Sequence, residues 1–289
     1  MRARKERLLK EDPATSCLLH NLGWLYYKQK DYKKAEALYK RALTIGEKRP
    51  EVSAPTALTL HNLGTLYQEQ KRYKEAEECY KRELAIKERL EEEDLDFADT
   101  LHNLADLYDA QERYEEGVGC LKRALKIKEK QGEDPELART LHDLADLYYV
   151  QRKYEEAEAY LKRAIAIREK ECGEDLQTGS YLHQLGWLYY VQGRYEEAER
   201  YFRRALTIRE VLLEEDVQMA TILNNLACLC YEHWRYEEAE PLYKRALGLR
   251  EKLLGAHHIN TQRVRNNYIN LLHATDRHRE ASQLEKQSQ

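Results

Sequence analysis

The five residues Leu19-His20-Asn21-Leu22-Gly23 decide the fold of this chain, because near copies of them recur at an almost constant interval. The copies occupy residues 60–64, 101–105, 141–145, 182–186 and 223–227, and a worn seventh copy lies at 266–269. Eleven residues after the central residue of the first six copies stands a tyrosine: Tyr32, Tyr73, Tyr114, Tyr154, Tyr195 and Tyr236. Internal repeats of this length are typical of solenoid proteins.

Each repeat contains two apolar faces with helical spacing. In the first repeat Leu18, Leu22 and Leu25 share one face, and after the polar turn 29–31 a second face runs through Tyr32, Ala35, Tyr39, Ala42, Leu43 and Ile45. A Gly or Ala ends each five-residue copy, which lets two helix backbones approach closely. The sequence predicts an all-α fold, a right-handed superhelical solenoid of antiparallel helix pairs, and it contains no strand pattern.

The pattern Leu-x-x-Leu-Gly-x-x-Tyr, followed by Tyr-x-x-Ala-Glu-x-x-Tyr-x-x-Ala-Leu, resembles the tetratricopeptide repeat (TPR). The interval of about 41 residues and the stretch 245–255, Arg-Ala-Leu-Gly-Leu-Arg-Glu-Lys-Leu-Leu-Gly, resemble the kinesin light chain subclass. We expect residues 1–13 to be the tail of a preceding repeat helix or an N-terminal cap. The repeats are expected at 14–54, 55–95, 96–135, 136–175, 176–216 and 217–258, and a degenerate seventh repeat with a C-terminal cap at 259–289.

Composition excludes several classes of protein. The 289 residues carry a net charge of −4 with an isoelectric point near 6.3, which argues against general nucleic-acid binding. No run of about 20 apolar residues predicts a membrane span, and no apolar segment follows the charged start as in a secretory signal. The six cysteines have no framework spacing. They predict free thiols and a cytoplasmic protein.

The sequence carries no motif for catalysis or for a cofactor. It lacks the glycine-rich phosphate loops, the Gly-x-Ser-x-Gly turn of hydrolases and the His-Glu-x-x-His zinc motif. We therefore expect no enzyme activity, no cofactor and no metal site.

The resemblance to TPR proteins implies that the first helix of each repeat lines the concave inner wall, where a peptide binds. The residues expected there are called the inner-wall set: His20, Asn21, Trp24, Tyr27, His61, Asn62, Asp99, His102, Asn103, Asp106, Asp109, Arg139, His142, Asp143, Asp146, Tyr149, His183, Gln184, Trp187, Tyr190, Asn224 and Asn225.

Two columns of the inner-wall set allow alternative interpretations. The column of five histidines either forms hydrogen bonds to the neighbouring repeat or meets a ligand, and first helices stacked roughly 10 Å apart exclude a metal ion shared between them. The amides of the Asn and Gln column either hold the backbone of an extended peptide or bond helix to helix. Outside the set, Trp234 stands in a turn where we expect local packing, and Glu83 replaces an expected Ala without an evident reason.

The charges of the inner-wall set suggest the kind of partner. Five aspartates lie near its middle against the single Arg139, which favours a protein or peptide ligand with Lys or Arg at its centre. The favoured function is a non-enzymatic scaffold that takes this peptide in its groove. The alternatives are a sensor array of a larger nucleotide-switch protein and a kinesin light chain-like cargo adaptor. The sequence names no partner and leaves the oligomeric state open.

Overall fold

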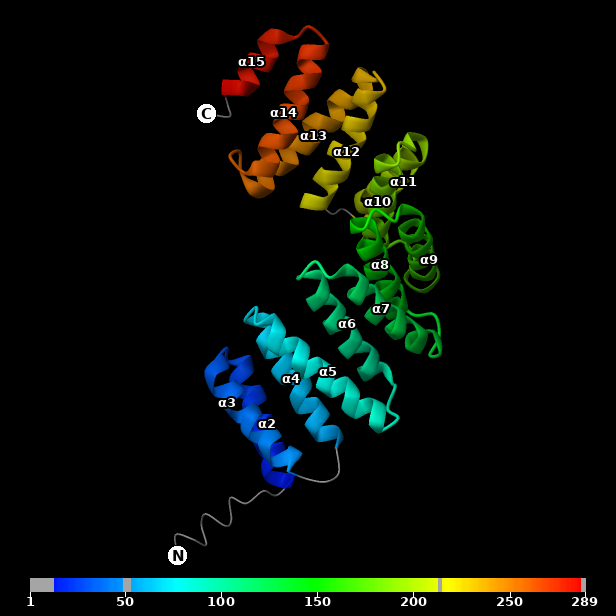
Figure 1. Cartoon of the computed structure of the whole chain (residues 1–289). Coiled ribbons are helices and arrows are strands. Elements are labelled where there is room, and N and C mark those ends of the chain that lie inside the picture. The colour runs from blue at the N-terminus through cyan, green and yellow to red at the C-terminus, as the bar shows by residue number, and fades with distance from the viewer. Residues whose placement is uncertain (1–12, 49–52, 213–214, 287–289) are drawn as a thin grey trace, which may run out of the picture. The chain divides into compact units, whose positions relative to one another are not determined.

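The computed structural model describes residues 13–48, 53–212 and 215–286, and these residues form fourteen helices and no strand. The predicted N-terminal segment 1–13 lies outside them except for Pro13. In chain order the helices are α2 (Pro13–Lys28), α3 (Tyr32–Glu47), α4 (Ala54–Glu69), α5 (Tyr73–Arg89), α6 (Leu95–Asp109), α7 (Tyr114–Glu129), α8 (Pro135–Val150), α9 (Tyr154–Cys172), α10 (Leu176–Val191), α11 (Tyr195–Val211), α12 (Val217–Glu232), α13 (Tyr236–Leu254), α14 (Ile259–Ala274) and α15 (His278–Lys286) (Figure 1).

The chain divides into two compact units, Met1–Gln151 with α2 to α8 and Arg152–Gln289 with α9 to α15. Within each unit the helices of a repeat pack on one another and each second helix packs on the first helix of the next repeat (Figure 1). First helices also contact each other directly, as α2 with α4 and α4 with α6. The predicted all-α fold of stacked helix pairs is confirmed.

Local signals explain where the helices begin and end. Asp94, Asp134, Asp175 and Asp216 precede first helices, and each carboxylate accepts a hydrogen bond from the backbone N–H three residues on. The turn from first to second helix contains one residue with positive φ, which closes the first helix: Lys30, Lys71, Glu112, Arg152, Gly193, Trp234 and Asp276.

Leucines that are buried on the later first helices have exposed equivalents on α2. Leu63 of α4 is 3% exposed, whereas the equivalent Leu22 of α2 is 42% exposed. Leu18 and Leu25 of α2 are exposed as well. The apolar face that the sequence predicts on α2 is therefore exposed, whereas Gly23 of the same helix is buried.

Arginines at the starts of the second helices tie neighbouring repeats together. Arg113 donates to Glu77 of the preceding second helix at 2.6 Å and to Glu116 of its own helix at 2.7 Å. Its guanidinium also lies 4.3 Å from the centre of the Tyr108 ring. The same arrangement recurs at Arg72 and Arg194. The ion pairs between repeats join residues 36 apart, which is why neither partner stands out in the sequence.

Gly64 allows the closest contact between the two helices of its repeat. A Cβ at Gly64 would lie 2.7 Å from Cε1 of Tyr80, a side chain that is fully buried. We predict that Gly64→Ala lowers the free energy of unfolding by about 1–3 kcal/mol, because the ring cannot move without displacing the core. Gly119→Ala is the matched control, since a Cβ there meets nothing within 4 Å and Ala favours the helix by about 0.5–1 kcal/mol. Urea unfolding measures both, and destabilisation by both variants alike would contradict the contact.

Candidate functional site

The inner-wall set lies on the first helices of six repeats, as the sequence predicts from the repeat pattern. In the first unit its residues come from α2, α4, α6 and α8, and in the second unit from α10 and α12. The set therefore forms two groups of side chains, and each group is described within its own unit.

Histidines of the set connect successive repeats. His20 Nε2 lies 3.2 Å from Asn62 Nδ2, and His183 Nε2 lies 3.0 Å from Asn225 Nδ2. His102 Nε2 lies 2.6 Å from a carboxylate oxygen of Asp143. Hydrogen bonding to the neighbouring repeat is confirmed for His20 and His183, whereas His102 makes an ion-pair contact. The amides of Asn62 and Asn225 bond helix to helix.

The remaining two histidines of the column bond within their own repeats. His61 Nδ1 lies 3.2 Å from Glu83, and His142 Nδ1 lies 3.1 Å from Asp143 of its own helix. Around His20 the bonds form a neutral chain, because Thr59 lies 3.0 Å from His20 Nδ1 and its hydroxyl donates to the Pro55 carbonyl. Burial lowers the pKa of His20, in keeping with a neutral ring.

His183 makes the stability of these contacts between repeats depend on pH. Burial, with a smaller contribution from Arg209, lowers the pKa of His183 to about 4. As the pH falls, this histidine is protonated in the unfolded chain, where its pKa is near 6.5, before it is protonated in the folded chain. The contribution of His183 to stability is therefore complete above pH 6.5 and is lost as the pH falls toward 4. Relative to His183→Gln, we predict that the wild-type chain loses about 2 kcal/mol of unfolding free energy between pH 7 and pH 5. Urea unfolding at both pH values measures the difference, and parallel pH profiles for the two chains would contradict it.

Four of the five predicted central aspartates gather around one small cavity. Asp106 and Asp109 of α6 and Asp143 and Asp146 of α8 line a space of about 90 Å³ with Ala105, Leu121 and Leu147. Asp99 lies apart from them, 3.4 Å from Lys128 Nζ. Arg139 is half-exposed and lies 3.9 Å from Asp143. The sequence thus predicts the acidic character of α6 and α8 but assigns one aspartate too many to the cluster.

The pKa values of these carboxyl groups are shifted in different directions. Burial raises the pKa of Asp106 and of Asp146, and the charges of neighbouring aspartates raise both further. Burial also opposes the charge of Asp143, but hydrogen bonds from His102 and His142 outweigh it and lower the pKa of Asp143. Asp143 is therefore the member whose charged form is stabilised by its histidine neighbours, and a cation would favour the charged forms of Asp106 and Asp146.

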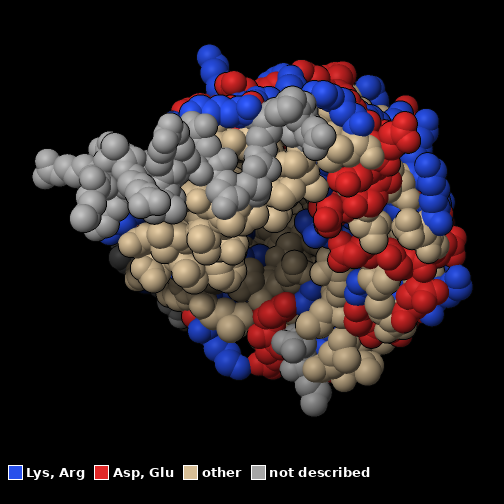
Figure 2. Space-filling view, turned by 90° about the horizontal axis from the view of Figure 1, so that it is seen from below, with Lys and Arg blue, Asp and Glu red and all other residues tan. Residues whose placement is uncertain are grey.

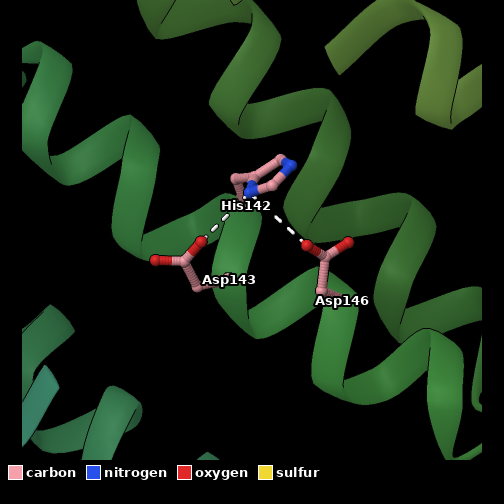
Figure 3. A group of neighbouring side chains, drawn as sticks. All are labelled: His142, Asp143 and Asp146. Carbon is pink, nitrogen blue, oxygen red and sulfur yellow. Dashed lines mark hydrogen bonds and ion pairs between the residues drawn. The ribbon is translucent and has the colours of Figure 1, made fainter. Parts of the chain in front are cut away.

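His142, Asp143 and Asp146 are the side chains of this region that could hold a metal ion (Figure 3). One ligand atom from each lies within 4.8 Å of the others, and His142 Nδ1 is 3.7 Å from Asp146. One imidazole and two carboxylates form a donor set that zinc and manganese accept. Here His142 already pairs with both aspartates, and Asp143 also pairs with His102. The expected absence of a metal site stays a prediction.

Comparison with known proteins establishes the family. The family model described as tetratricopeptide repeat matches residues 1–48, 55–130, 96–170, 136–211, 180–252 and 218–289. The chain belongs to the tetratricopeptide repeat family. No curated protein matches the sequence significantly.

Solved structures agree with the TPR fold. BtubC (BKLC) from P. vanneervenii superposes with a TM-score of 0.62 at 24% identity, covering 85% of this chain and 92% of that one. A kinesin light chain protein with nearly identical TPR-like repeats from Podospora anserina gives a TM-score of 0.59 at 24% identity, over 69% and 97% of the two chains. The TPR-sensor ATPase PH0952 from Pyrococcus horikoshii, a STAND protein, gives 0.75 at 18% identity, over 98% of this chain and 42% of that one.

Glu83 is the polar residue that the repeat pattern failed to explain. It is 1% exposed, and its carboxylate accepts a hydrogen bond from Thr100 at 2.7 Å and lies 3.3 Å from Lys87 Nζ. His61 completes the cluster. The residue that breaks the TPR pattern is therefore the acceptor for three polar groups, and Lys87, four residues on, is the one signal in the sequence that could have indicated it.

Aromatic residues of the set lie where the first helices of the TPR array approach their turns. Tyr27 donates to Glu69 at 2.5 Å, and Trp187 stacks on Tyr190 with ring centres 5.2 Å apart.

Trp234, outside the set, is 78% exposed with a φ of 64°, so the expectation that it packs locally is wrong. It occupies the left-handed position of its turn.

All six cysteines are free thiols, as predicted. No helix among the described residues has the length and apolar character needed to cross a membrane.

Proposed function

We propose that this TPR chain is a non-enzymatic cytoplasmic scaffold that binds an extended peptide of a partner protein along the inner-wall set, with Lys or Arg at the centre of the peptide. The observation that carries the proposal is the shared cavity of Asp106, Asp109, Asp143 and Asp146. Burial and mutual repulsion disfavour the charges of Asp106 and Asp146, and an ammonium or guanidinium group relieves that repulsion.

Other side chains of the first unit suit such a peptide. The Asn62 amide donates one N–H to His20, so its second N–H and its carbonyl oxygen can pair with a peptide backbone. At the start of the first unit, Trp24 is half-exposed and already holds Lys28 Nζ 5.4 Å from its ring centre. A peptide Arg on such a ring gains about 0.5–2 kcal/mol.

The test begins with a pull-down from the native lysate, in which mass spectrometry identifies the partner and calorimetry then measures its affinity. We predict that Asp106→Lys weakens binding tenfold or more, because the new cation faces the peptide cation across the cavity. Asp276→Lys, which makes the same change in charge at an exposed turn of the second unit, is the control and should bind as the wild type does. Equal binding by Asp106→Lys and wild type would contradict the acidic groove.

The sensor function is the second candidate, and the likeness to the TPR-sensor ATPase over 98% of this chain favours it. Whether the genomic reading frame contains a nucleotide-binding domain next to these repeats decides this candidate. The cargo-adaptor function is supported by the likeness to the kinesin light chain protein, and recovery of a motor protein in the pull-down would favour it.

A further inference from the structure

A second and much larger pocket lies in the first unit. It is lined by the N-terminal halves of α2, α4 and α6, by the C-terminal half of α5 and by the turn before α6. It encloses about 620 Å³, which is within the range of ligand sites in proteins. Figure 2 shows that acidic side chains gather beside a broad uncharged surface on one face of the molecule. The pocket is called the α2–α4–α6 pocket below.

The charge of this pocket is strongly one-sided. Among the described residues that line it, five carboxylates (Glu83, Glu92, Asp94, Asp96 and Asp99) stand against one ammonium group, that of Lys87. Lys87 pairs with Glu83, Asp94 caps α6 and Asp99 lies near Lys128. Glu92 and Asp96 remain as exposed carboxylates at the rim.

Part of the pocket wall is apolar. Ala54, Pro55 and Leu58 of α4 form this part, and Leu58 is half-exposed. A long aliphatic stem can lie on this wall while a charged head reaches the carboxylates, as Lys and Arg side chains do on protein surfaces.

His61 adds a directional contact. The buried carboxylate of Glu83 lies 3.2 Å from His61 Nδ1 and so favours the tautomer that donates from Nδ1. The Nε2 atom then carries a lone pair and accepts hydrogen bonds. A donor-rich head group in the pocket, rather than an anion, satisfies this acceptor together with the rim carboxylates.

We propose that the α2–α4–α6 pocket anchors a Lys or Arg side chain, with an adjoining apolar side chain, of the bound peptide. The inference rests on the proposed function and gives it a specific anchor, separate from the cavity between α6 and α8. Glu92 and Asp96 face the cation, Pro55 and Leu58 carry its stem, and Glu83 acts as a positioning residue through His61.

The probe is the fluorescein-labelled peptide Gly-Ser-Leu-Arg-Leu-Arg-Ser-Gly, with fluorescence anisotropy as the readout. Its matched control replaces both arginines by citrulline, which keeps the shape and removes the charge. We expect the citrulline peptide to bind at least tenfold more weakly. The double variant Glu92→Gln/Asp96→Asn should bind the arginine peptide about fivefold more weakly. The variant Glu78→Gln/Glu115→Gln, with the same change in net charge on exposed residues outside the pocket, should bind it as the wild type does.

The outcomes separate the two proposals. If the arginine peptide binds but the pocket variant and the control variant behave alike, the anchor is wrong and the proposed function stands. Equal binding of the arginine and citrulline peptides overturns the role of charge in the anchor. If the arginine peptide does not bind at millimolar concentration, both the anchor and the basic-peptide function fail.

Discussion

Glu83→Ala is expected to destabilise the chain by about 3–5 kcal/mol, although it restores the residue found at this step in five other repeats (Ala42, Ala124, Ala164, Ala205 and Ala246). The cost arises because Lys87 is largely buried and Glu83 is its partner at 3.3 Å. Thr100 and His61 lose their acceptor as well. Urea unfolding followed by circular dichroism measures the change.

The double variant Glu83→Ala/Lys87→Met is the control for this prediction. It removes the buried cation together with its partner, and replacing both members of a buried ion pair is often close to neutral. We expect it to recover most of the stability that Glu83→Ala loses. If Glu83→Ala is as stable as the wild type, the cluster contributes nothing and Glu83 is a tolerated departure from the repeat pattern.

Removal of one repeat is expected to leave a folded protein, whereas removal of one helix is not. Deleting residues 96–135 joins Leu95 to Glu136, so α5 is followed by a first helix as before. Each helix pair buries its apolar face only against its neighbours, and a repeat array tolerates excision of a whole unit for that reason. The shortened chain should keep helical circular dichroism and cooperative unfolding.

Deletion of residues 96–113 is the contrasting experiment. It removes fewer residues, but it places α7 directly after α5 and leaves the buried faces of two second helices without the first helix between them. We expect loss of cooperative unfolding and aggregation. If the two deletions behave alike, the modular account of stability is wrong.

The helix pairs could be predicted from sequence because local signals specify them: the recurring copies, the apolar spacing and the residues at the turns. The links from His20 and His183 to the next repeat could be anticipated from stacking alone. The cluster at Glu83 could not, because its partner Thr100 lies on another helix and is brought close only by packing.

The same reason limits the prediction of the site. Asp99 and Asp106 lie on one helix, yet Asp99 lines the α2–α4–α6 pocket and Asp106 the small cavity between α6 and α8. Their separation depends on how α6 is rotated against its neighbours, which composition does not specify. The pocket itself combines α2, α4, α5, α6 and the turn before α6, and no single motif marks it.

The most direct test of the central claim is a selection from a random peptide library on the wild-type chain and on the double variant Asp106→Lys/Asp146→Lys. The account predicts that peptides with central Lys or Arg are enriched on the wild-type chain and that the double variant loses them. Enrichment of acidic peptides on the wild-type chain, or of the same peptides on both chains, would contradict it.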